Sequence, residues 1–212
     1  MNAGIKLVSL LLLCPQIVGA QSFLEQFSYE GLRFSGIGVE FGGVASDRLT
    51  REFSGAVRVD YGRIAPKVRV LIGASYFEGE LNATEIQELA LGIQRVVNPA
   101  MSSLIDIGTI TWSDIEVDLD LQYVLEAGTR VTTYVGVGFA THVRNGSGTI
   151  IDDTFVEDAL DTIDAGLNLS FGTAVEVFPA MQFTIDLRGG LTSELRTATA
   201  RAGFMYRVAG RG

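Results

Sequence analysis

The segment 115–143 restricts the fold of this chain most, because it alternates apolar and polar residues along two long arms. In residues 115–123, Ile, Val, Leu, Leu and Tyr occupy every second position, with Glu, Asp, Asp and Gln between them. The sequence Glu-Ala-Gly-Thr then separates this arm from a second alternating arm, residues 131–143. Successive side chains of a β-strand point to opposite faces. The pattern therefore predicts a long β-hairpin with one apolar face and one polar face.

The lengths of the two arms favour a strand that crosses a membrane. Each arm exceeds the roughly 5–6 residues that are typical of strands in soluble proteins. Each also reaches the roughly 9–11 residues that a membrane-spanning strand needs. The same alternation recurs along the chain and predicts eight strands. They are expected at 32–43, 53–63, from 68, from about 110, 131–143, 167–177, 183–188 and 198–208.

The connections between these strands alternate between short and long. Tight turns are expected at Pro66, Gly128 and Pro179, and the two longest loops follow the third and fifth strands. Short turns on one side and longer loops on the other are typical of an up-and-down barrel in an outer membrane. The sequence thus predicts an all-β fold, an eight-stranded antiparallel transmembrane β-barrel.

The longest connection is expected to contain one short helix. Asn82 followed by Glu85 resembles a helix N-terminus with a capping acid. Apolar residues then recur at helical spacing up to Val97, and Asn98-Pro99 ends the pattern. The second long connection, 144–164, is acidic, and a helical turn is expected at 155–160. Its cluster of Asp152, Asp153, Glu157, Asp158 and Asp161 is interpreted as a solvated acidic loop, with a divalent cation as the alternative.

Residues 1–20 have the features of a secretory signal peptide. Lys6 supplies a positive charge, residues 7–13 are apolar, and Val18-Gly19-Ala20 offers small residues for cleavage. A short transmembrane anchor and a lipoprotein signal at Cys14 are the alternatives. We expect residues 21–212 to form a single barrel domain in a bacterial outer membrane, of the Gram-negative type of cell envelope.

Alternation alone permits two kinds of barrel. A soluble, lipocalin-like barrel turns its apolar face inward, whereas a membrane barrel turns it outward into lipid. Glycines decide between them, because Gly36, Gly73, Gly136 and Gly172 share the polar face. On a solvated face glycines only weaken strands, but inside a narrow barrel they make room for Tyr134 and for long arginine side chains.

The polar face is therefore predicted to line the lumen. An eight-stranded barrel has an interior just wide enough for side chains, so opposite charges are expected to pair there and fill it as a polar plug. A cation bound by Glu116, Asp118 and Asp120 is the alternative to arginine pairing. The predicted lumen residues are Arg58, Asp60, Arg69, Glu116, Asp118, Asp120, Glu176, Asp186, Arg188, Arg201 and Arg207.

The signal, the eight alternating strands and the rhythm of turns and loops resemble the small outer-membrane β-barrel family of OmpA/OmpX type. The resemblance covers essentially all of residues 21–212. It implies contact with outer-membrane lipid and lipopolysaccharide, and with the barrel-assembly machinery during biogenesis. Gly203, Tyr206 and Val208 match the places of a C-terminal assembly signal, although such chains usually end on an aromatic residue and here Ala209 to Gly212 follow.

No motif in the sequence indicates catalysis or a cofactor. The net charge of −9 and the lack of a basic patch disfavour nucleic acid. His142-Val143-Arg144-Asn145 resembles the His-x-Ser-Asn motif of lipid A deacylases, but Arg144 stands where the nucleophilic serine is required. We expect a non-enzymatic, monomeric barrel without metal or cofactor, with a structural or surface-interaction role and no open pore. The alternatives are a carrier or conduit for a small hydrophobic ligand, of OmpW or lipocalin type, and a lipid A-modifying enzyme.

Overall fold

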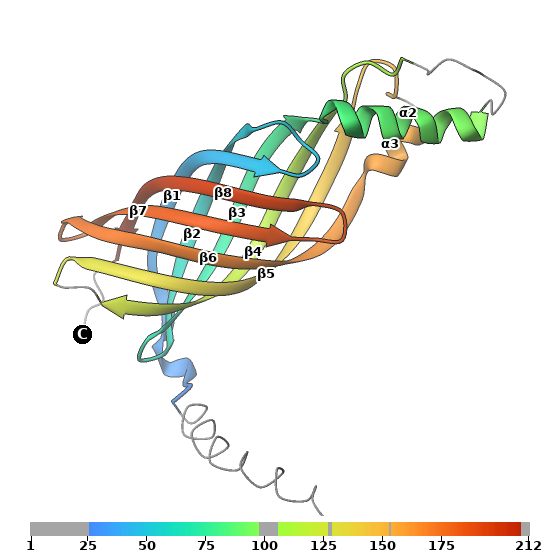
Figure 1. The fold of residues 1–212 in the computed structure, drawn as a ribbon. Helices are drawn as coiled ribbons and strands as arrows, with labels where there is room; N and C mark the ends of the chain where they lie inside the picture. Colours follow the sequence, from blue (N-terminus) through green and yellow to red (C-terminus); the bar gives the residue numbers. More distant parts are fainter. Residues whose placement is uncertain (1–25, 98–105, 127–128, 153, 209–212) are drawn as a thin grey trace, which may run out of the picture.

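The computed structural model is a closed barrel in which each strand is antiparallel to its neighbours along the chain, and β8 closes the ring on β1 (Figure 1). It describes residues 26–97, 106–126, 129–152 and 154–208. The strands are β1 (Leu32–Ser46), β2 (Glu52–Ala65), β3 (Val68–Glu80), β4 (Thr111–Glu126), β5 (Val131–Ser147), β6 (Thr162–Phe178), β7 (Met181–Leu191) and β8 (Arg196–Arg207). The helices are η1 (Tyr29–Gly31), α2 (Ala83–Val97) and α3 (Phe155–Leu160). The predicted eight-stranded antiparallel barrel is confirmed.

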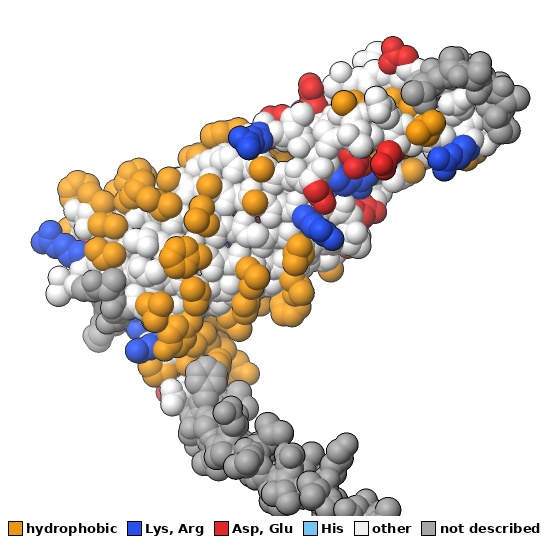
Figure 2. Space-filling view, in the orientation of Figure 1, with side chains coloured by type: hydrophobic (Ala, Val, Ile, Leu, Met, Phe, Trp, Pro, Cys, Tyr) orange, Lys and Arg blue, Asp and Glu red, His pale blue; other side chains and the backbone are white. Residues whose placement is uncertain are grey.

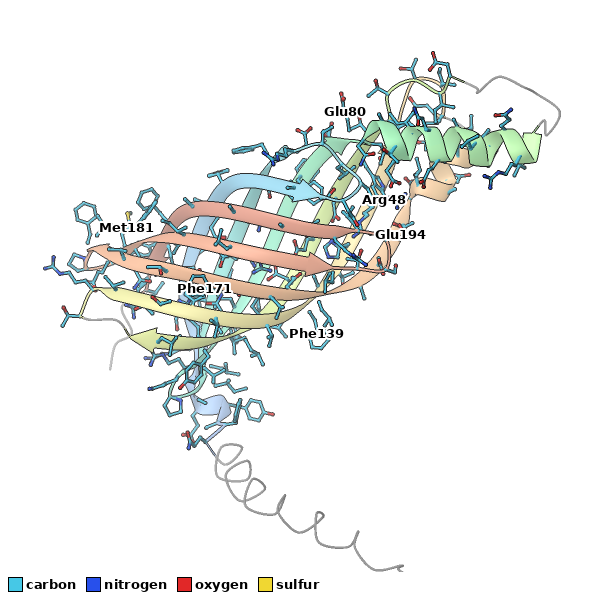
Figure 3. The ribbon with its side chains drawn as sticks, viewed as in Figure 1. Arg48, Glu80, Phe139, Phe171, Met181 and Glu194 are labelled. Carbon is cyan, nitrogen blue, oxygen red and sulfur yellow. The ribbon has the colours of Figure 1, made fainter. Side chains whose placement is uncertain are left out.

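The apolar face of the strands lies on the outside of the barrel, as predicted. Phe139, Leu169 and Phe171 have exposed fractions of 72%, 62% and 51%, and the labelled Phe139 points away from the barrel in Figure 3. In Figure 2, apolar side chains are spread over the visible barrel wall among uncharged polar side chains and backbone. The alternating partners of these residues are buried in the lumen, among them Arg58, Asp118 and Asp120. This inside-out arrangement is that of a membrane barrel.

The two ends of the barrel differ, and we name them by their connections. The turn end carries the tight turns at Pro66 and Pro179, which join β2 to β3 and β6 to β7. The loop end carries α2 and α3, which lie together beyond the barrel wall in Figure 1. The predicted turn at Gly128, the signal peptide, Asp153 and Ala209 to Gly212 lie outside the described residues. No helix within the described part of the chain is long and apolar enough to span a membrane.

Several strands continue past their predicted ends at the loop end. The β4–β5 ladder reaches the pair Thr111–Ser147, and β6 begins at Thr162 rather than Leu167. On the outward face, apolar residues give way to polar ones at Glu78, Ser113 and Asn145. Backbone hydrogen bonds continue across this change, because they do not depend on the apolar pattern from which the strand ends were predicted.

The lumen changes in the opposite sense at the loop end, where it becomes apolar. Ile110 is completely buried, and Ile86, Leu89 and Ile93 of α2 pack against the same group of side chains. We call this group the loop-end core. Its buried members are Val44, Leu49, Phe77, Leu81, Ala90, Ile107, Ile110, Trp112, Ile151, Val156 and Leu195.

Trp112 lies near the outer end of β4, a depth at which aromatic residues are often found at a membrane interface. Instead its side chain is buried in the loop-end core, and its indole Nε1 donates a hydrogen bond to the Leu160 carbonyl at 3.1 Å. Trp112 shares the inward face of β4 with Asp114, so the strand directs it into the barrel and not toward lipid.

Candidate functional site: the lumen and its two ends

The middle of the lumen is built around two buried arginines, of which Arg58 on β2 is the first. One of its terminal nitrogens, Nη1, lies 2.5 Å from Asp118 Oδ1 on β4. Its Nε lies 3.4 Å from Glu40 Oε2 on β1. The guanidinium therefore bridges three strands across the lumen. A buried arginine loses its hydration, so both carboxylates are needed to compensate that cost.

Arg188 on β7 is the second arginine, and it shares Asp118 with Arg58. Its Nη1 lies 3.2 Å from Asp118 Oδ1 and 3.5 Å from Glu116 Oε1, and its Nη2 donates to Asp120. Asp118 thus lies between two guanidinium groups from β2 and β7. The residues Arg58, Glu116, Asp118, Asp120 and Arg188 are each at most 6% exposed, so this network lies in the buried interior of the barrel.

Glycines provide the space that these side chains occupy. Gly73 lies opposite Arg58 on one side and Asp118 on the other. A Cβ atom at Gly73 would collide with both the Arg58 guanidinium and the Asp118 carboxylate. Gly172 leaves comparable room for the Tyr134 ring, whose hydroxyl donates to Asp186 Oδ2 at 3.0 Å. The expected role of lumen glycines is therefore confirmed at these positions.

The predicted lumen residues do not all join this network. Arg201 is buried in the lumen, but its Nε and Nη2 donate to the Ser54 hydroxyl, at 3.1 Å and 2.8 Å, and not to a carboxylate. Asp60 and Arg69 form a separate pair nearer the turn end, with 3.6 Å between Oδ2 and Nη1. Glu176 and Arg207 line the opening at the turn end, where Arg207 is exposed.

A second polar cluster, centred on Asp114, lies between the middle of the lumen and the loop-end core. Asp114 accepts hydrogen bonds from Arg144 Nε at 2.9 Å and interacts with His142 Nδ1 at 3.0 Å. Arg144 also donates to Thr192 Oγ1 at 3.0 Å and lies over the Trp112 ring. His142 is thus buried in the lumen against Asp114.

Sequence reasoning missed several members of the lumen, namely Glu40, Ser54, Asp114 and Arg144. Glu40 and Asp114 continue the inward alternation of their strands, so that signal was available. Arg144 was interpreted as part of a loop because the apolar pattern ends at Val143. The pairing of Arg144 with Asp114 requires the register of β4 on β5, which no local pattern reveals.

The acidic residues offer no preformed metal site in the part of the chain that the structure describes. Glu116, Asp118 and Asp120 each face Arg188, which supplies the positive charge that a cation would otherwise provide. In the acidic connection, Asp161 instead accepts hydrogen bonds from the Asn145 side chain and the Gly146 amide, at 2.9 Å and 3.0 Å.

The three predicted assembly-signal residues lie on or directly after β8. Gly203 faces the lumen, whereas Tyr206 and Val208 are exposed on the outside, with exposed fractions of 53% and 41%. The Val208 amide donates to the Ser35 carbonyl at 2.9 Å and so continues the closure of β8 onto β1. Recognition of these residues by assembly machinery stays a prediction.

Comparison with known proteins supports the fold class. No protein-family model and no curated protein matches the sequence. Among solved structures, neisserial surface protein A superposes with a TM-score of 0.58 at 12% identity, covering 84% of this chain and 100% of that one. The N-terminal barrel domain of Pseudomonas aeruginosa OprF has a TM-score of 0.47 at 14% identity, covering 84% of this chain and 100% of that one. A major outer membrane protein of Thermus thermophilus has a TM-score of 0.49 at 13% identity, covering 82% of this chain and 99% of that one. The chain has the fold of the small eight-stranded outer-membrane β-barrels, and the predicted resemblance is confirmed at this level.

Proposed function

We propose that this protein is a non-enzymatic, monomeric barrel of the bacterial outer membrane, exported by a signal peptide that is removed after Ala20. Its lumen is plugged, and its role is structural or lies in interactions at the cell surface. Its partners are outer-membrane lipid and lipopolysaccharide, and the barrel-assembly machinery during biogenesis. In this orientation the turn end faces the periplasm and the loop end faces outward.

The observation that carries the plugged lumen is the network of Arg58 and Arg188 with Glu116, Asp118 and Asp120. Its side chains come from β2, β4 and β7 and are almost completely buried. A hydrated ion would have to separate these pairs, and breaking a buried ion pair typically costs about 3–5 kcal/mol. The loop-end core is a second obstacle along the same axis, because it is apolar and closely packed.

The loop end supports a role in surface interactions. Small barrels place their variable elements there, whereas the wall serves the membrane. In this chain the loop end holds α2, α3 and most of the exposed carboxylates visible in Figure 2. The Arg48 side chain connects α2 to the β7–β8 loop (Figure 3). Its Nε donates to Glu85 on α2 at 2.7 Å, and its Nη1 donates to the Glu194 carbonyl at 3.4 Å.

The alternative of a carrier for a hydrophobic ligand needs an apolar cavity inside the barrel. Instead, Ile37, Val117 and Val137 are exposed on the outer face, and the middle of the lumen contains arginine–carboxylate pairs. The alternative of a lipid A-modifying enzyme needs a nucleophile beside His142, where Arg144 contributes a guanidinium. Both features favour the plugged barrel.

Planar-bilayer recording of the refolded protein tests the plug. We expect no sustained conductance from the native chain, and ion conductance from the variant Arg58→Ala/Asp118→Ala/Arg188→Ala. Heat-modifiable migration on a gel and recovery in the membrane fraction test the location. A steady open conductance of the native chain would refute the plug, and recovery as a soluble periplasmic protein would refute the membrane barrel.

A further inference from the structure

The lumen is open at the turn end, where a cavity of about 480 Å³ lies below the central network. We call it the turn-end vestibule. The argument concerns its lining residues Arg33, Asp60, Arg63, Arg69, Gln182 and Arg207. An adjoining hollow of about 620 Å³ shares Arg63, Gln182 and Arg207 and adds Arg130 and Glu176.

The side chains that line the vestibule carry a net positive charge, whereas the whole chain carries a net negative charge. Four arginines line it against two carboxylates, Glu30 and Asp60, in a protein with a net charge of −9. Asp60 is already engaged, because its Oδ1 accepts the Gly62 amide at 2.8 Å and its Oδ2 faces Arg69. A concave site lined by one sign of charge focuses the electrostatic field and attracts ions of the other sign.

The arginines are arranged as potential donors at different depths. Arg69 forms part of the floor, where its Nη2 donates to Gln122 at 2.5 Å and its guanidinium lies over the Tyr134 ring. Its Nε is buried and has no hydrogen-bond partner among the described residues. Nearer the opening, Arg33 and Arg207 are exposed, and their guanidinium groups form no ion pair with another described side chain.

The lumen above the vestibule prevents an anion from moving further inward. Arg58, Arg188 and Arg201 are buried there together with the larger number of carboxylates Glu40, Glu116, Asp118, Asp120 and Asp186. An anion drawn into the vestibule would therefore meet repulsion above it. This change of sign along the axis makes the vestibule a place of binding and not the entrance to an anion channel.

We propose that the turn-end vestibule binds a phosphate-bearing ligand through Arg33, Arg69 and Arg207. The planar guanidinium fork matches phosphate oxygens with two parallel hydrogen bonds. The cavity has the volume of roughly 16 water molecules at about 30 Å³ each, so it admits a group larger than a single phosphate. The ligand is either a soluble pyrophosphate-like anion or the headgroup of an anionic lipid that reaches the barrel mouth.

Titration of the refolded barrel with sodium pyrophosphate tests the soluble ligand. Micelles of an amine-oxide detergent are required because phosphocholine detergents would occupy the site. We expect saturable one-to-one binding by calorimetry, together with shifts of the arginine Nε–Hε resonances. Arg33→Gln/Arg207→Gln should weaken it about 10-fold or more, since two charged hydrogen-bond donors are lost. Both side chains are exposed, so this variant should fold, and heat-modifiable migration checks that it does.

Lys67→Gln is the matched control, because Lys67 lies on the neighbouring tight turn and does not line the vestibule. It removes a positive charge at the same end and should change the affinity less than about twofold, since exposed charges are screened by salt. Nanodiscs of a phosphate-free glycolipid with and without phosphatidylglycerol test the lipid headgroup. Shifts of the Arg207 resonance that depend on phosphatidylglycerol would assign the ligand to lipid.

The proposal is overturned if neither pyrophosphate nor phosphatidylglycerol produces a saturable shift. It is also overturned if Lys67→Gln weakens binding as much as the double arginine variant, because the effect would then be general electrostatics. The periplasmic direction of the vestibule rests on the proposed outer-membrane location. Ligand binding to the purified barrel does not depend on that location. The binding proposal and the proposed function can therefore fail separately.

Discussion

At the scale of single residues, a glycine on one strand of this lumen leaves the space that an arginine side chain on the neighbouring strand occupies. The Arg58 side chain can cross β3 to reach Asp118 only because Gly73 stands between them in the register. A bulkier residue would force the guanidinium away from its carboxylate, and both groups are buried. The glycine content of the strands thus follows from the size of the arginines, since an eight-stranded interior has no spare width.

The substitution Gly73→Val tests this dependence. We expect a loss of about 1–3 kcal/mol in the free energy of unfolding, because the new side chain overpacks the lumen and separates a buried ion pair. Urea unfolding in lipid vesicles measures it. Gly189→Val is the matched control, since a Cβ atom at Gly189 meets nothing within 4 Å on the outer face. Equal effects of the two substitutions would contradict the argument.

Arg188 differs from the surface arginines because its carboxylate partners are buried. If Arg188 is removed, water does not replace it as their partner. Removing it by Arg188→Met leaves Glu116, Asp118 and Asp120 buried with one fewer positive charge among them. We expect a loss of about 3–5 kcal/mol, measured by the same urea titration. Arg207→Met, which removes an exposed arginine, should stay within about 0.5 kcal/mol. If Arg188→Met were as mild as Arg207→Met, the network would not stabilise the barrel.

At the scale of elements, the barrel wall inverts its polarity between the membrane part and the loop end. Along β4, Ile115 faces outward and Asp114 inward, whereas Ser113 faces outward and Trp112 lies inside the loop-end core. Most of β4 therefore has apolar side chains outside and polar ones inside, as in a membrane barrel. Its end at the loop end has the reverse arrangement, as in a soluble protein. The reason is the solvent, because water outside the barrel favours polar outward residues and apolar inward ones.

The loop-end core is expected to unfold without the rest of the barrel. Ile110→Ala should destabilise it by about 2–5 kcal/mol, the usual cost of a cavity at a fully buried aliphatic residue. The membrane part should persist, because its ladders are independent of these side chains. Limited trypsin digestion at Arg95 in α2 measures the local opening, and heat-modifiable migration reports on the barrel.

Ile115→Ala supplies the comparison for that experiment. Ile115 is five residues further along and has an exposed fraction of 50% on the outer face. Its truncation removes contacts with the surrounding lipid or detergent and leaves the loop-end core intact. Cleavage at Arg95 should therefore keep its native rate. If Ile110→Ala also left that rate unchanged, α2 would not be held by the core.

At the scale of the whole molecule, charge is distributed unequally between the ends. Exposed carboxylates such as Glu80 and Asp158 gather at the loop end, whereas Arg33, Arg63, Lys67, Arg130 and Arg207 lie at the turn end. Between the ends runs a wall whose outer surface is apolar (Figure 2). The molecule thus has two different aqueous surfaces, and in the proposed orientation they face opposite sides of the membrane.

Labelling in intact cells tests this orientation. The lone cysteine, Cys14, lies in the predicted signal peptide, so a cysteine added elsewhere would be the only one in the mature chain. We expect Asp158→Cys to react with a maleimide that cannot cross the membrane and Lys67→Cys to react only after lysis. Both positions are exposed. The reverse pattern would show that the turn end faces outward.

The sequence by itself determined the strands of the membrane part, their faces and helix α2, because these depend on local alternation and helical spacing. It located the central arginines and carboxylates on the inward face for the same reason. Only the tertiary structure decided which of them meet, since Arg58, Asp118 and Arg188 come from β2, β4 and β7 and meet only when the barrel closes. The loop-end core and the turn-end vestibule also belong to the closed barrel, because their residues are distant in sequence and adjacent only through strand register.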